Sequence, residues 1–254
     1  MIATPIALLP SLGLETFVGL SSDDPMGTRW SECAFGVHLT RYQPRQTEMI
    51  GILPPKSRKE IILPAHGRDE LVLVERRPGQ AIPSDAAMLR SCVIYRDRTG
   101  AEGRVIYEQP PRWNTAGKPS TTLTTIAWIQ TGPKLSTTVV LLYGSSDSTG
   151  PRVEYNYQFR NQEGERIRFG CLTLPLQSVR TITMEPEKLS ASYSFIGSCP
   201  AASVIVLVIT QHLDGGVTVE HTQPGHAAML PGDPRLARKY KDAAVQQWSL
   251  AHAG

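Results

Sequence analysis

Residues 203–221 read SVIVLVITQHLDGGVTVEH, and this stretch decides the fold class. The run of β-branched residues and leucine at 204–209 is typical of a buried strand. Aspartate and two glycines at 214–216 then predict a hairpin turn. Val217 and Val219 alternate with polar neighbours, as in a half-buried strand. The stretch therefore predicts a β-hairpin inside a β-rich body.

The rest of the chain favours the same class. Residues 152–159 alternate cleanly, which places Val153, Tyr155 and Phe159 on one face of a strand. About thirteen such segments recur between turn residues, with no helical pattern between them. Residues 43–59 contain three prolines and are predicted to be a loop. No internal repeat is visible. We predict an all-β, antiparallel β-sandwich of jelly-roll type, with two packed β-subdomains as the alternative.

Three segments are expected along the chain. Residues 1–30 are apolar, lack a helical or strand period and are broken by Pro5 and Pro10, which predicts an extended N-terminal arm of a mature chain rather than a signal peptide. Residues 31–232 form the sandwich body. The proline- and glycine-containing segment 109–120 is where the body would divide into two.

The last segment, 233–254, is predicted to be an amphipathic helix. Asp233 and Pro234 are a typical cap and first helical residue. Apolar residues follow at helical spacing. Four cations near the N-terminus oppose the helix dipole, which an anionic partner would compensate; a solvated helix packed on the sandwich is the equal alternative. These cations are Arg235, Arg238, Lys239 and Lys241.

Two further basic groups lie in the net basic region 41–112. With the four helix cations they form the candidate surface for an anionic partner or a neighbouring subunit. Ordinary solvated surface charge is the more common explanation for such residues. The two groups are Lys56, Arg58 and Lys59, and Arg96 and Arg98.

The sequence contains no motif for catalysis, cofactor binding or metal binding. His221 and His226 have no third ligand nearby in the sequence, so an exposed turn is the simpler interpretation. The four cysteines match no zinc or redox spacing, which predicts free thiols, buried at Cys92 and Cys171. No apolar run is long enough to span a membrane. We expect a protein that is not an enzyme and that has no cofactor and no metal.

The composition resembles that of β-sandwich virion proteins. Residues 172–183, LTLPLQSVRTIT, followed by 204–210, are similar to the carboxy-terminal β-domain of matrix proteins from negative-strand RNA viruses. This resemblance implies a virion structural protein and assigns no residue a role. The chain departs from many RNA-packaging coats because it has no arginine-rich tail, which favours a shell, matrix or minor-capsid role.

The leading hypothesis is a self-assembling viral structural protein, a coat or shell component whose termini contact neighbouring subunits. Its partners would be copies of itself and other virion proteins, with weak contact to nucleic acid or an anionic surface. It would reside in the virion, and in the host cytoplasm during assembly. One alternative is a carbohydrate- or protein-binding module that uses loops at 96–103, 144–151 and 211–216. The other is a hydrolase whose site is assembled from loops.

Overall fold

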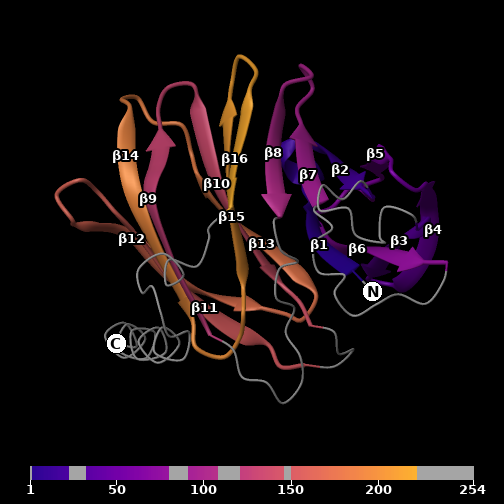
Figure 1. The fold of residues 1–254 in the computed structure, drawn as a ribbon. Coiled ribbons are helices and arrows are strands. Elements are labelled where there is room, and N and C mark those ends of the chain that lie inside the picture. The colour runs from indigo at the N-terminus through magenta and orange to yellow at the C-terminus, as the bar shows by residue number, and fades with distance from the viewer. Residues whose placement is uncertain (1, 23–32, 80–90, 108–120, 146–149, 222–254) are drawn as a thin grey trace, which may run out of the picture. The chain divides into compact units, whose positions relative to one another are not determined.

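The computed structural model describes residues 2–22, 33–79, 91–107, 121–145 and 150–221 (Figure 1). The described residues form strands and one short 3-10 helix. The chain divides into two compact units, Met1–Pro111 with Gly215–Val219, and Arg112–Asp214 with Glu220–Gly254. The boundary at Pro111 falls within the proline-containing segment 109–120. Among the described residues no helix is both long and apolar enough to cross a membrane.

The first eight strands form two four-stranded sheets, β1-β6-β3-β4 and β5-β2-β7-β8, here named the first sandwich. Hydrogen bonds join the two sheets across the core. Tyr95 Oη donates to Ala7 O at 3.1 Å, and Thr4 Oγ1 lies 2.9 Å from Ser91 Oγ. The elements are β1 (Ile2–Leu8), η1 (Pro10–Leu12), β2 (Glu15–Ser21), β3 (Phe35–Tyr42), β4 (Arg45–Leu53), β5 (Arg58–Leu63), β6 (Glu70–Pro78), β7 (Ser91–Arg96) and β8 (Glu102–Tyr107).

The next eight strands form the sheets β13-β10-β15-β16 and β12-β11-β14-β9, here named the second sandwich. One apolar cluster draws on both sheets, with Val139 and Val206 from one and Tyr155, Phe159 and Phe195 from the other. The Phe159 and Phe195 rings meet edge to face with centroids 5.1 Å apart. The strands are β9 (Thr122–Thr131), β10 (Leu135–Tyr143), β11 (Val153–Arg160), β12 (Arg166–Leu174), β13 (Ser178–Met184), β14 (Ala191–Cys199), β15 (Ile205–His212) and β16 (Val217–His221).

The two sandwiches share one topology. Adding eight to each strand number converts β1-β6-β3-β4 into β9-β14-β11-β12, and β5-β2-β7-β8 into β13-β10-β15-β16. The chain is therefore an internal structural duplication, although its sequence shows no repeat. A core needs apolar side chains of suitable volume on the inward face and not particular residues, so two copies can keep the strand order while their sequences diverge.

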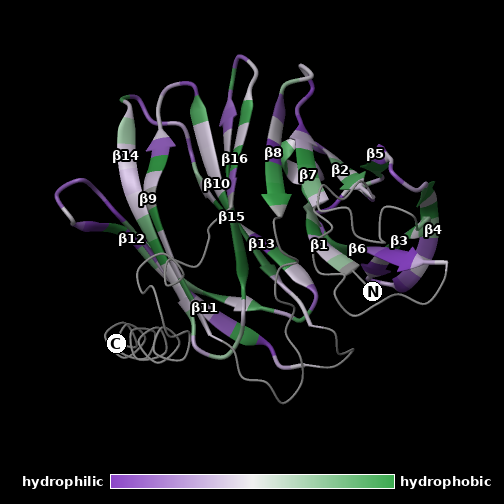
Figure 2. Ribbon diagram, in the orientation of Figure 1, coloured by the Kyte–Doolittle hydropathy of each residue, from purple (hydrophilic) through white to green (hydrophobic). Residues whose placement is uncertain are grey.

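The deciding stretch behaves as predicted. β15 and β16 are neighbours in one sheet. Residues 205–209 are buried on both faces of β15, and Figure 2 shows this strand coloured as hydrophobic along much of its length. Burial on both faces explains the continuous apolar run, because neither face needs polar residues.

The N-terminal arm is a wrong prediction. β1 pairs antiparallel with β6 from Ile2↔Arg76 to Leu8↔Glu70, and β2 lies between β5 and β7. Ile6 and Leu8 are fully buried. β1 lacks a strand period because residues 4–8 are buried on both faces, whereas β2 does alternate in burial. β1 tolerates Pro5 because it is an edge strand that needs fewer backbone donors. The sandwich body therefore begins at residue 2 and not at residue 31.

The jelly-roll prediction also needs correction. A jelly roll pairs its first and last strands, whereas β1 and β8 lie in different sheets, as do β9 and β16. The all-β class and the antiparallel sandwich architecture are confirmed. The predicted helix at 233–254 lies outside the described residues.

Candidate functional site

The first candidate surface is β4, the last strand of its sheet. Its residues are exposed on both faces from Arg45 to Met49, and it ends at the fully buried Leu53. Met49 is 62% exposed and Ile52 is 55% exposed. Prolines nearby made 43–59 look like a loop, so the sequence missed this strand. An edge strand with both faces in solvent has little need of the alternation that would have revealed it.

The second candidate surface is β12, the equivalent edge of the second sandwich. It is also nine residues long and also ends at a fully buried leucine, Leu174. Phe169 is 62% exposed and Ile167 is 44% exposed. The Arg166 guanidinium lies over the Phe169 ring at 4.0 Å from its centroid. Figure 1 shows the turn of the β11–β12 hairpin projecting from the body of this sandwich.

Edges of this kind favour pairing with another chain. A terminal strand presents a row of backbone N–H and C=O groups that no further strand of its sheet takes up. Exposed apolar side chains along the same strand add an area that is stabilised by burial. Addition of a strand to a sheet edge is a known mode of protein recognition, and each of these two surfaces has an exposed edge strand.

The two edges differ in charge. β12 carries Arg166 and Arg168 and has no acidic residue between its ends. Arg168 Nη1 also donates to Thr183 O at 2.7 Å, which holds its guanidinium against β13 of the opposite sheet. β4 instead carries Arg45 and Glu48, so its own charges balance.

The predicted basic group Lys56, Arg58 and Lys59 lies at the start of β5, and all three side chains are exposed. Lys56 adopts the left-handed conformation with φ 50° in the turn that follows Leu53. Lys59 Nζ lies 3.5 Å from Ile52 O. β5 is the edge of its sheet, and cations on an edge strand oppose pairing with another chain. A contact between this group and an anionic partner or a neighbouring subunit stays a prediction.

The predicted residues Arg96 and Arg98 differ in their surroundings. Arg96 Nε donates to Glu102 Oε1 at 2.8 Å, and its guanidinium lies 4.1 Å from the centroid of the Phe17 ring. Hydrogen bonds from Arg104 and then from Arg96 lower the pKa of Glu102. The charge of Arg96 is thus compensated within the first sandwich, while Arg98 is exposed at the turn. The remaining candidates, Arg235, Arg238, Lys239 and Lys241, lie outside the described residues.

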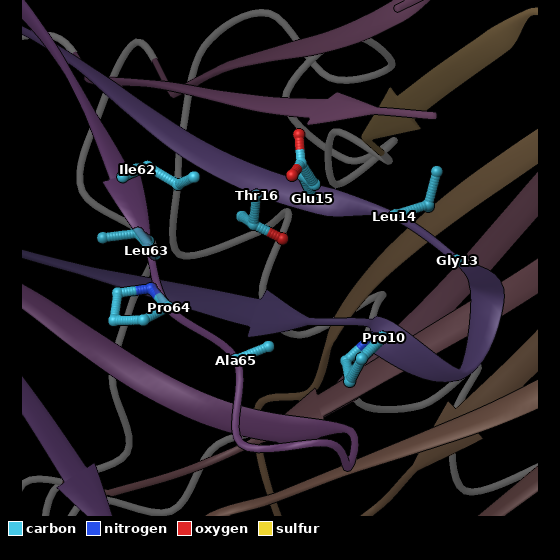
Figure 3. Close-up of a pocket in the computed structure, with 9 residues that line it drawn as sticks. All are labelled: Pro10, Gly13, Leu14, Glu15, Thr16, Ile62, Leu63, Pro64 and Ala65. Carbon is cyan, nitrogen blue, oxygen red and sulfur yellow. The ribbon is translucent and has the colours of Figure 1, made fainter. Parts of the chain in front are cut away.

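A hollow of about 360 Å³ lies between the start of β2 and the end of β5 (Figure 3). Its walls are mostly apolar, with Pro10, Ile62 and Pro64 among them. Glu15 is the one titratable side chain in its lining. Glycoside hydrolysis needs two carboxylates facing one another, which this lining does not supply.

Other chemistry-bearing groups are dispersed. No cluster of three or more potential metal ligands occurs within the described ranges. The four cysteines are free, as predicted. Of the two predicted to be buried, Cys92 is partly buried and Cys171 is exposed, because it lies on the edge strand β12. Burial raises the pKa of the Cys199 thiol, which lies in the core of the second sandwich.

No family model matches this sequence, and no curated protein matches it. Among solved structures, the chain is similar to a glycosyl hydrolase family 2 member from Bacteroides cellulosilyticus at 9% identity and a TM-score of 0.21, covering 85% of this chain and 27% of that one. A putative beta-galactosidase from Bacteroides fragilis matches at 12% identity and a TM-score of 0.21, covering 87% and 32%.

A mutant VP2 protein of infectious bursal disease virus, in derived T=1 particles, matches at 13% identity and a TM-score of 0.23, covering 93% of this chain and 70% of that one. The chain thus spans about a third or less of the two bacterial enzymes and about two thirds of the viral protein. TM-scores this low carry no argument about function. Any argument about function therefore starts from the edge strands of this chain.

Proposed function

We propose that this protein is a self-assembling structural protein, a coat or shell component of a virion. The observation that carries the proposal is the pair of exposed apolar edge strands, β4 and β12, one on each sandwich. The resemblance of residues 172–183 and 204–210 to viral matrix proteins supports the virion setting. On this proposal the sandwiches supply rigid building blocks and their edges supply the contacts.

Copies of the same chain are the expected partners, with other virion proteins as further ones. The predicted contact to nucleic acid or an anionic surface would fall to exposed cations such as Lys56 and Arg98. Because Arg96 is already paired, this contact is expected to be weak. The proposed location is the virion, and the host cytoplasm during assembly.

Size-exclusion chromatography with light scattering on the full-length protein tests the proposal. We expect a species of many chains that grows with protein concentration, and closed shells by electron microscopy. A monomer that persists at all concentrations would overturn self-assembly. Assembled material without any closed particle would overturn the shell role.

A carbohydrate-binding module is the second candidate, because Trp128 on β9 is 67% exposed. Exposed aromatic rings are the usual stacking platforms for sugars. β9 and β12 are the two edges of one sheet, so Trp128 and Phe169 both belong to it. A glycan array tests this candidate, and binding that disappears in Trp128→Ala would favour it over assembly. The hydrolase alternative has no paired carboxylates in the described hollow to support it.

A further inference from the structure

We propose that β4 of one copy pairs with β12 of the next copy, so that chains join head to tail. This inference rests on the proposed self-assembly and names the surfaces that perform it. The occupant of each exposed edge is then a second copy of this chain, bound through the equivalent strand of its other sandwich.

The outward faces of the two strands match. Met49 pairs with His38, which neighbours the buried Leu39, so Met49 lies on the face turned away from the core. Phe169 pairs with Gln158, between the core-facing Tyr157 and Phe159, so it too lies on the outward face. An antiparallel sheet that continues from β4 into β12 keeps these faces on one side, where Met49 and Phe169 bury apolar surface together.

Charge distinguishes this pairing from pairing between two copies of β12. A β12–β12 pair would hold four arginines and no acidic residue to offset them. β4 offers Glu48, and in an antiparallel pair with Met49 opposite Phe169 this carboxylate lies diagonally from Arg168. Charge does not separate this pairing from a β4–β4 pair, because β4 carries both Arg45 and Glu48; the variants below do.

The shared topology explains why the contact can repeat. β4 and β12 occupy equivalent edge positions in their sheets, and each is nine residues long. A contact between different surfaces of identical subunits leaves one β4 and one β12 available after each addition. Growth therefore continues until a ring or shell closes.

Variants that block one edge each test the pairing. Met49→Asp blocks β4 and Phe169→Asp blocks β12; both side chains are 62% exposed, so folding should survive, as circular dichroism would check. We expect each variant alone to remain monomeric. A mixture of the two should form a complex of one copy of each and nothing larger, seen by native mass spectrometry. Leu189→Asp, at an 80% exposed loop position, is the matched control and should assemble like the unaltered protein.

The outcomes separate this inference from the proposed function. If Met49→Asp alone still forms dimers, β12 pairs with itself, and if Phe169→Asp alone still forms dimers, β4 pairs with itself; either result shows that the inference is wrong. If both variants assemble as the unaltered protein does, other surfaces hold the copies together, and self-assembly stands without this pairing. If the unaltered protein is itself monomeric, the proposed function fails along with the inference.

Discussion

At the scale of single residues, the buried Arg41–Glu70 ion pair is a site where a substitution should destabilise the fold strongly. The Arg41 side chain is 5% exposed and that of Glu70 is 10% exposed. Arg41 also donates to the carbonyl of Pro64. Removing one member of a buried pair leaves the other charge without compensation.

Glu70→Ala is therefore expected to lower the free energy of unfolding by about 3 kcal/mol. Asp214→Ala is the matched control, because it breaks the exposed Lys134–Asp214 pair, and should change stability little. Urea denaturation of both variants measures the difference. Equal losses in the two variants would contradict this reading of Arg41.

Tyr42 gives the first sandwich an alkaline dependence. Burial, with a smaller effect from Glu75, raises the pKa of Tyr42 to about 12. In the unfolded chain a tyrosine ionises near pH ~10. Between pH ~10 and about 12 this residue is ionised in the unfolded chain but neutral in the folded protein. The stability that it contributes is therefore complete below pH ~10 and is lost as pH rises toward about 12. Denaturation across this window should show a smaller loss in Tyr42→Phe, and identical curves would contradict the prediction.

Position 197 on β14 requires glycine because the Tyr155 side chain lies directly against its backbone. A Cβ at this position would lie 2.1 Å from Tyr155 Oη and 2.6 Å from its Cζ. Tyr155 is fully buried and has no room to retreat. Gly197→Ala should cost about 1–3 kcal/mol as an overpacked core. Thermal unfolding measures the loss of stability. Adding Tyr155→Phe to Gly197→Ala should relieve part of it, because this removes the hydroxyl that the new Cβ would meet. If the losses of the two single variants simply add in the double variant, the contact is not the cause.

At the scale of elements, a strand's place in its sheet decides its behaviour. β10 and β15 lie inside their sheet, and β4 and β12 lie at edges. Amide protons of inner strands exchange only through larger openings, whereas those of exposed edges exchange readily. Hydrogen exchange of the dilute protein should therefore be slow in β10 and fast in β4 and β12.

Assembly should change this pattern at the edges. We expect added protection in β4 and β12 on concentration, with little change in β5, whose cations oppose pairing. Mass spectrometry of peptides from the two states measures this. Protection that rises in β5 but not in β12 would contradict the assigned surfaces.

At the scale of the whole molecule, the duplication predicts two cooperative units. Each sandwich has two sheets that are joined through buried residues of its own. We expect two calorimetric transitions, with Glu70→Ala lowering one and Gly197→Ala lowering the other. A single transition shifted equally by both variants would show that the sandwiches unfold together.

The sequence alone determined the β-rich class and the buried hairpin at 203–221, because runs of β-branched residues and turn glycines act locally. It could not reveal β1, because Pro5 and burial on both faces erase the alternation that marks a strand. β2 does alternate in burial, so its signal is present at residues 15–21. The pairing order, the duplication, and the exposure of β4 and β12 became visible in the folded chain. Those depend on which distant strands become neighbours, and whether Phe169 faces water is set by its position at a sheet edge and not by the residues beside it.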